Sequence, residues 1–156
     1  MPDLLVKLYE LPDIRVHIEQ LKKEGIHVRR AMAYEKNQVV EWVRENFGKG
    51  WASECDVAFS NNPTSCFIAT ENKNIIGFAC YECTCKNFFG PMGISETARN
   101  RGIGKALLLN CLHAMSSDGY AYAIIGGVDD LAFYEKTVGA IAIPGSSPGI
   151  YRDRLK

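Results

Sequence analysis

The sequence has no excess of either charge and no long hydrophobic run. Its 18 basic residues balance 18 acidic ones, so the composition predicts no strong attraction to nucleic acid or to an anionic membrane surface. No apolar stretch approaches the ~20 residues that span a bilayer. The first residues, Met1 to Lys7, lack the basic segment and the apolar run of a signal peptide. We therefore expect a cytoplasmic protein.

Disulfides and metal sites are also not expected, although the chain contains six cysteines. Without an export signal, the default state of these cysteines is the reduced thiol. The spacing of Cys80, Cys83 and Cys85 invites a metal site, but the segment resembles a strand, in which Cys80 would face away from the other two. No second Cys/His pair stands at zinc-site spacing. We therefore predict no metal and small, buried cysteine side chains.

With 156 residues, 47% of them hydrophobic and 23% charged, the chain has the size and composition of one globular domain. Hydrophobic periodicity, helix caps and turn residues predict its elements. Helices are expected at about 13–24, 35–47, 51–59, 102–115 and 130–138. Strands are expected at 4–11, 26–31, 65–70, 74–83, 88–94, 120–126, 140–143 and 150–152. This order implies a mixed sheet with helices on both faces.

The most informative stretch lies between the strand at 88–94 and the next helix, and has the sequence Arg99-Asn-Arg-Gly-Ile-Gly-Lys105. Two glycines at a strand-to-helix turn let a ligand approach the backbone, and the first N–H groups of the helix lack intrahelical acceptors. Those donors, the helix dipole and the side chains of Arg99, Arg101 and Lys105 favour an anion. The sequence therefore predicts a phosphate-binding turn; the alternative is a glycine-rich helix start that only packs on the strand.

Two common phosphate turns do not fit this stretch. A P-loop requires Gly where Arg99 stands and Ser or Thr where Ala106 stands. A dinucleotide-binding turn requires a third glycine where Leu107 stands. The remaining pattern, Arg-x-x-Gly-x-Gly, resembles motif A of the GNAT superfamily of acyl-CoA-dependent N-acyltransferases, where the turn holds the pyrophosphate of coenzyme A.

A second segment, from Ala132 to Ala140, resembles the motif B helix of that superfamily, usually Phe-Tyr-Glu-Lys-x-Gly-Phe. One extra residue precedes Gly139, Ala140 replaces the usual aromatic residue, and the Asn often found upstream is absent. The resemblance covers roughly residues 26–151, which leaves 1–25 as an added strand and helix. It implies an α+β fold of three layers (α/β/α), with a mixed, mostly antiparallel sheet that opens beside the strand at 88–94.

The resemblance also assigns roles to residues. It implies acetyl-CoA as the acyl donor, with its pantetheine arm along the open strand edge and a main-chain N–H near Met92 polarising the thioester carbonyl. Tyr134 would protonate the departing thiolate; its alternative role is packing in the core. The residues expected to bind coenzyme A are Met92, Gly93, Ile94, Arg99, Asn100, Arg101, Gly102, Ile103, Gly104, Lys105 and Ala106.

The acceptor is expected to be a primary amine, on a small molecule or a peptide, which must lose a proton before attack. Glu82 is the candidate base, or equally an exposed strand carboxylate, and His17, His27 and His113 are expected outside the cleft. These inferences predict an N-acetyltransferase acting by direct transfer. The alternative is a catalytically weak acyl-CoA-binding or regulatory module. The sequence leaves the acceptor open, and also the oligomeric state, a homodimer included.

Overall fold

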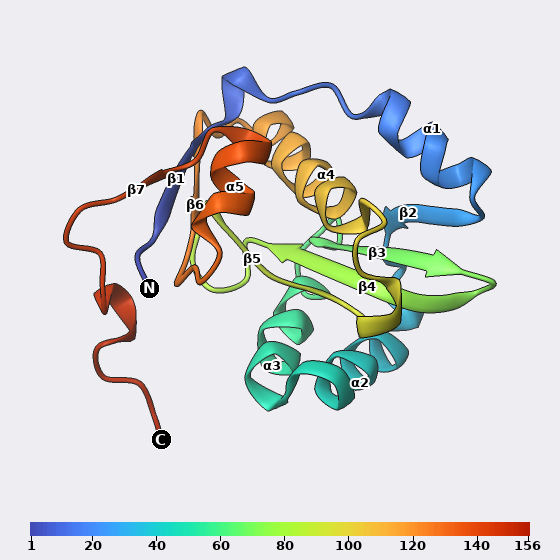
Figure 1. The fold of residues 1–156 in the computed structure, drawn as a ribbon. Coiled ribbons are helices and arrows are strands. Elements are labelled where there is room, and N and C mark those ends of the chain that lie inside the picture. Colours follow the sequence, from blue (N-terminus) through green and yellow to red (C-terminus); the bar gives the residue numbers. More distant parts are fainter.

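The computed structural model describes all 156 residues, and one sheet with helices on both faces organises the chain (Figure 1). The strands are β1 (Leu4–Lys7), β2 (Ile26–Arg30), β3 (Cys66–Glu71), β4 (Asn74–Tyr81), β5 (Phe88–Ile94), β6 (Tyr122–Ile125) and β7 (Ile141–Ala142). The α-helices are α1 (Arg15–Lys23), α2 (Lys36–Phe47), α3 (Lys49–Ala58), α4 (Ile103–Ser117) and α5 (Leu131–Val138). None of these helices has the length and hydrophobicity that a membrane crossing requires.

The seven strands form one mixed sheet in the order β2-β3-β4-β5-β6-β1-β7. Neighbouring strands are antiparallel throughout, except for β5 and β6, which run parallel. Figure 1 shows α2 and α3 on one face of the sheet and α4 and α5 on the other. The predicted three-layer α+β fold with a mostly antiparallel sheet is therefore confirmed.

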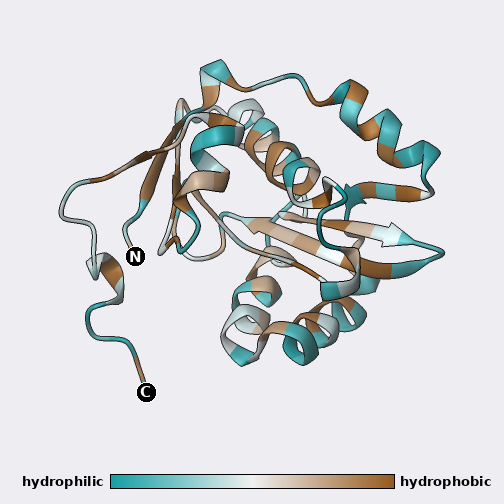
Figure 2. Cartoon of the chain, viewed as in Figure 1, coloured by the Kyte–Doolittle hydropathy of each residue, from teal (hydrophilic) through white to brown (hydrophobic).

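Alternation along β3 and β4 divides the hydrophobic side chains between the two faces of the sheet. Phe67 and Ala79 join the core beneath α4, whereas Ile68 and Phe78 join the core beneath α2 and α3. Figure 2 shows hydrophobic residues along α4 and hydrophilic residues on the outer turns of α2. The buried residues of α4 are Ile103, Ala106, Leu107, Leu108, Leu109, Cys111, Leu112 and Met115. This burial fixes the start of α4 relative to the strands.

The two ends of the chain differ from the predicted elements. The first strand ends at Lys7, because Leu8–Glu10 turns into a 3-10 helix. β1 lies between β6 and β7 and pairs with both, so it is an internal strand of the sheet. The predicted strand at 150–152 is wrong, because Gly149–Tyr151 forms a 3-10 helix after Pro148, and proline followed by glycine favours a turn. The division of the chain at residue 25 stays a prediction.

β5 and β6 separate after a short stretch of pairing. Only the first two residues of β5, Phe88 and Phe89, pair with β6. The next residues are Gly90 and Pro91, and a proline has no N–H to donate to a ladder. From there to Ile94, β5 is bonded to β4 alone and its other side is an open edge.

Candidate active site

The turn before α4 presents a row of free main-chain donors. The N–H groups from Arg101 to Lys105 donate to no acceptor in the protein, as the start of a helix requires. Gly102 caps α4 in the left-handed conformation, with φ of 79°, which an L side chain rarely adopts. The predicted phosphate turn therefore has the donors and the backbone conformation that binding an anion would require.

The three cationic side chains of this turn have different partners. Arg101 forms a bidentate ion pair with Glu71, with N–O distances of 3.0 and 2.7 Å. This pair raises the pKa of Arg101 and lowers the pKa of Glu71. Arg99 reaches the carbonyl oxygen of Ile94 at 3.5 Å, and Lys105 is exposed. Arg99 and Lys105 are thus the cations not already engaged by a carboxylate.

His17 lies on this turn, and the expectation that all three histidines lie outside the site is wrong for it. Its Nε2 donates to the carbonyl oxygen of Gly102 at 2.7 Å, because a carbonyl oxygen can only accept. A Cβ added to Gly102 would come within 2.6 Å of the imidazole ring. Helical spacing places His17 on the apolar face of α1 with Ile14, Ile18 and Leu21, but does not identify the residue that it meets.

The open edge of β5 faces the turn and α5. A Cβ added to Gly104 would lie 3.8 Å from Phe133 on α5 and 3.9 Å from Met92 on β5. The face of β5 that is turned toward α2 is closed, because the ring of Phe47 lies directly against Gly93. The structure therefore brings the residues predicted to bind coenzyme A, 92–94 and 99–106, into one region.

Tyr134 is half-buried on α5, beside the paired end of β5. Its ring makes edge contacts with Phe89 and Phe133, at centroid distances of 6.4 and 5.0 Å. Burial, together with the charge of Asp130, raises the pKa of Tyr134 to about 12. The phenol therefore stays neutral at ordinary pH and keeps a hydrogen to donate. Asp130 also caps α5 by accepting from the N–H of Phe133.

Glu82 is engaged in the loop between β4 and β5. One carboxylate oxygen accepts from the N–H of Asn87, and the other accepts from the Tyr120 hydroxyl at 3.0 Å. The residue itself has a positive φ of 60°, so β4 ends just before it. Both oxygens have protein partners, so these contacts support a structural role for Glu82 and do not support the predicted role as base.

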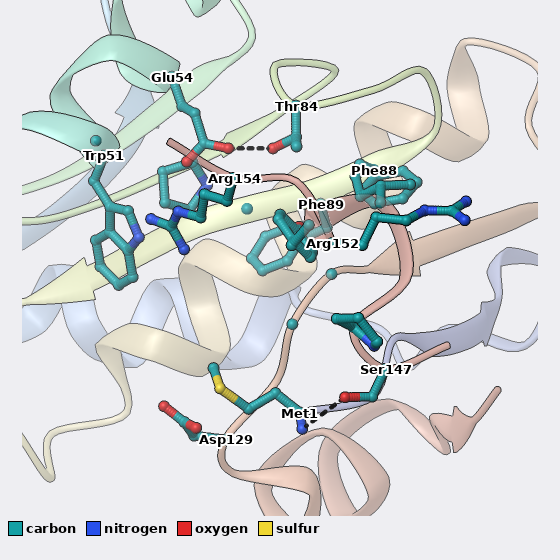
Figure 3. Close-up of a pocket in the computed structure, with 18 of the residues that line it drawn as sticks. Met1, Trp51, Glu54, Thr84, Phe88, Phe89, Asp129, Ser147, Arg152 and Arg154 are labelled. Carbon is teal, nitrogen blue, oxygen red and sulfur yellow. Dashed lines mark hydrogen bonds between the residues drawn. The ribbon is translucent and has the colours of Figure 1, made fainter. Parts of the chain in front are cut away.

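A cavity of about 860 Å³ opens where β5 and β6 separate, on the side of α3 and the C-terminal segment. Figure 3 shows Trp51, Glu54 and Thr84 on its wall. Glu54 is half-buried and accepts from the Thr84 hydroxyl at 2.5 Å, and neither of its oxygens forms an ion pair. Glu54 is thus a carboxylate that faces the cavity with capacity to accept another proton or hydrogen bond.

The C-terminal segment forms the other wall of this cavity. A Cβ added to Gly126, at the end of β6, would come within 2.5 Å of the Tyr151 hydroxyl, and burial raises the pKa of Tyr151. Sequence reasoning missed both Glu54 and Tyr151. Glu54 has no local signal, since it is one polar residue of an amphipathic helix and its partner Thr84 stands 30 positions away.

Comparison with protein families identifies the central part of this region. The model of the acetyltransferase (GNAT) domain family matches residues 62–137. That stretch runs from β3 to α5 and contains the open strand edge, the turn and Tyr134. This segment of the chain belongs to the acetyltransferase (GNAT) domain family. The parts of the chain outside the match include α1 with His17, α3 with Glu54, and the C-terminal segment.

Solved GNAT structures share the fold at low sequence identity. The glucosamine N-acetyltransferase region of a fungal β-N-acetylglucosaminidase superposes with a TM-score of 0.73 at 16% identity, over 91% of this chain and 19% of that one. A GCN5-related N-acetyltransferase from Sphaerobacter thermophilus superposes with a TM-score of 0.69 at 18% identity, over 91% of this chain and 48% of that one. A GNAT acetyltransferase from Brucella melitensis, solved with acetyl-CoA, superposes with a TM-score of 0.56 at 16% identity, over 76% of this chain and 88% of that one.

The chain spans about a fifth and about a half of the length of the first two of these structures. Comparison with curated proteins found no match. These likenesses show the GNAT fold.

Proposed function

We propose that this protein transfers the acetyl group of acetyl-CoA to a primary amine by direct attack of the amine on the thioester. The observation that carries the proposal is the row of free N–H groups from Arg101 to Lys105 beside the open edge of β5. A helix start of this kind suits a pyrophosphate, and an open strand edge suits the amides of a pantetheine arm. The acetyl-CoA in the Brucella melitensis structure supports this donor.

During transfer, the amine nitrogen bonds to the carbonyl carbon as the carbon–sulfur bond breaks. A main-chain N–H near Met92 would stabilise the charge that develops on the carbonyl oxygen. Tyr134 would donate a hydrogen bond to the departing thiolate. Its pKa of about 12 lies above the ~8.5 of an ordinary thiol, so the phenol keeps its own proton and the thiolate is protonated by solvent.

We place the base at Glu54 rather than at Glu82. Near neutral pH an alkylamine is an ammonium ion, and it must lose one proton before it attacks and another after. The Glu54 carboxylate lines the cavity and has one protein donor, Thr84, whereas Glu82 has two donors in its loop. Glu54 would attract the ammonium form and accept its proton directly or through water. The acceptor then enters from the side of α3, and the donor lies on the side of α4.

Two measurements test this proposal separately. Isothermal titration calorimetry with coenzyme A tests the turn and the strand edge. Thiol release from acetyl-CoA tests turnover, with a panel of amino sugars, polyamines, amino acids and peptides with free N-termini, each corrected for hydrolysis. Binding with amine-dependent release is the expected result. Binding without turnover on any amine would favour the alternative, a catalytically weak acyl-CoA-binding module, and absence of binding would refute both.

A further inference from the structure

Three cysteines converge between the sheet and α3, and a fourth lies nearby. The sulfur atoms of Cys55 on α3, Cys66 on β3 and Cys80 on β4 all lie within 4.8 Å of one another, and all three residues are 0% exposed. Cys66 and Cys80 are direct cross-strand partners, so their side chains leave the same face of the hairpin. None of the three forms a disulfide. A fourth cysteine, Cys83, packs against the same hydrophobic core.

Cys83 lies outside the 4.8 Å group but on the same side of the sheet, because β4 ends before it. Had the strand continued, Cys80 and Cys83 would point to opposite faces. Instead β4 stops at Tyr81 and Glu82 has a positive φ, which redirects the chain. Burial, followed by contact with neighbouring thiols, among them Cys83, raises the pKa of Cys80. The two-residue spacing of Cys80 and Cys83 is that of many zinc ligands, and the face argument against a metal fails.

We propose that Cys55, Cys66, Cys80 and Cys83 bind one zinc ion. With sulfur separations of at most 4.8 Å, an ion at the centre of the three buried sulfurs would lie about 2.8 Å or less from each, against about 2.3 Å in a zinc–thiolate bond. An inward shift of roughly half an ångström closes this gap. The sulfur of Cys83 lies beyond the 4.8 Å group, and it would complete a tetrahedron by turning toward the ion and giving up its hydrogen bond to the carbonyl oxygen of Tyr81, now 3.2 Å long.

The chemistry of the four thiols favours a divalent, thiophilic ion. Each zinc–sulfur bond forms as one thiol loses its proton to solvent, so ion uptake releases protons. Buried thiolates need a cation, since burial disfavours the charged form. Zinc neutralises two of the four thiolate charges, whereas monovalent copper, which also prefers thiolates, would neutralise one. The apolar surroundings therefore favour zinc.

The proposed zinc site adjoins the proposed acceptor cavity. Cys55 directly follows Glu54, and Cys83 directly precedes Thr84. The hydrogen bond between Glu54 and Thr84 lies on the cavity wall. A zinc ion would hold α3 against the loop that follows β4 and so fix both members of this pair. This consequence rests on the proposed function, whereas zinc binding itself does not.

Cys111 offers a matched control within the same chain. It is also 0% exposed, but it belongs to the core beneath α4, where its thiol lies 3.7 Å from the carbonyl oxygen of Ala79. Cys111→Ala therefore removes a buried cysteine of the same size without touching the proposed ligands.

The test is the metal content of the full chain, purified under reducing conditions and incubated with zinc. Wild type and Cys111→Ala should each hold about one zinc per chain. Cys66→Ala should hold less than about a tenth of that, and Cys83→Ala should lose its zinc to a chelator faster than wild type. Cobalt should give a thiolate-to-cobalt charge-transfer absorption in wild type and Cys111→Ala, and not in Cys66→Ala. Chelation should lower the melting temperature of wild type and Cys111→Ala only.

Wild-type protein that binds neither zinc nor cobalt would overturn the proposal. Equal zinc contents in Cys66→Ala and wild type would also overturn it. If Cys66→Ala does not fold, the proposal is overturned when Cys83→Ala and wild type lose zinc to the chelator at equal rates. Zinc is measured without acetyl-CoA or amine, so failure of the transfer assay leaves this test intact.

Discussion

At the scale of single residues, Tyr134 offers the sharpest test of the transfer chemistry. Its phenol stays neutral because its pKa is about 12, so it can act only as a hydrogen-bond donor. Tyr134→Phe keeps the ring between Phe89 and Phe133 and removes that donor. We expect acetyl-CoA affinity to be unchanged and single-turnover transfer to slow by ~10- to 10²-fold, because a hydrogen bond to a charged group contributes about 1.5–3 kcal/mol. Equal rates would assign Tyr134 to core packing alone.

The same hydroxyl predicts a loss of stability in alkali. The folded pKa of about 12 lies above the unfolded value of 10. Its contribution is therefore fully present below pH 10 and is lost as the pH rises toward 12, where the unfolded chain releases the proton first. This difference between the folded and unfolded pKa corresponds to about 2–3 kcal/mol of folding stability. Urea unfolding of wild type and Tyr134→Phe across this pH range should show that wild type loses more stability than the variant. Parallel plots of stability against pH for the two proteins would contradict the prediction.

Glu54 and Glu82 can be separated by the same isosteric change. Glu54→Gln should lower kcat/KM for the amine by ~10²-fold with little effect on stability, because a proton acceptor is removed from the cavity wall. Glu82→Gln should leave the chemical step nearly intact and lower the free energy of unfolding by about 1–2 kcal/mol, because its loop loses charge-assisted hydrogen bonds. Steady-state kinetics and urea unfolding of both variants decide. The reverse pattern would restore Glu82 as the base.

At the scale of elements, the turn into α4 is tested through Gly104. A Cβ there would make only ordinary contacts, at 3.8 to 4.0 Å, so Gly104→Ala should fold normally and bind coenzyme A somewhat more weakly. Gly104→Val adds two methyl groups where the ligand must approach the backbone. Its affinity should fall by at least ~10-fold, or about 1.4 kcal/mol. Calorimetry on both folded variants measures the affinity for coenzyme A, and unchanged affinity in Gly104→Val would refute the site.

The elements that the sequence predicts well carry their signals locally. The strand at 88–94 matches β5, and the polar turn between β3 and β4 contains Asn72 and Lys73, both with positive φ. Residues that meet across elements were not predictable in this way. His17 reaches Gly102 over 85 positions of sequence, and no periodicity reports such a contact. The strand pattern predicts the wrong face for Cys83, because Glu82 has a positive φ and β4 ends before it. The conformation of one such residue is not visible in an alternation of residue types.

At the scale of the whole molecule, β1 holds the sheet together at its least paired end. Leu4 is 0% exposed and lies opposite Ile125 of β6 and Ala142 of β7. Leu4→Ala should cost about 2–5 kcal/mol through lost burial and the cavity left behind. Leu155→Ala, at a position 95% exposed, should change stability by less than about 0.5 kcal/mol. Denaturant unfolding compares the two. A small loss for Leu4→Ala would mean that β1 is peripheral to the fold.

The place of β1 also sets an order of events during synthesis. Lys7 pairs with Tyr122, and Leu4 pairs with Ala142, so β1 has no partner until more than a hundred further residues have been translated. At ~5–20 residues per second, this wait lasts on the order of 6–25 seconds. An unpaired apolar strand exposed for that time is open to wrong partners and to chaperones. This sheet can close only after β6 and β7 have left the ribosome, so the pairing of β1 is a late step of folding.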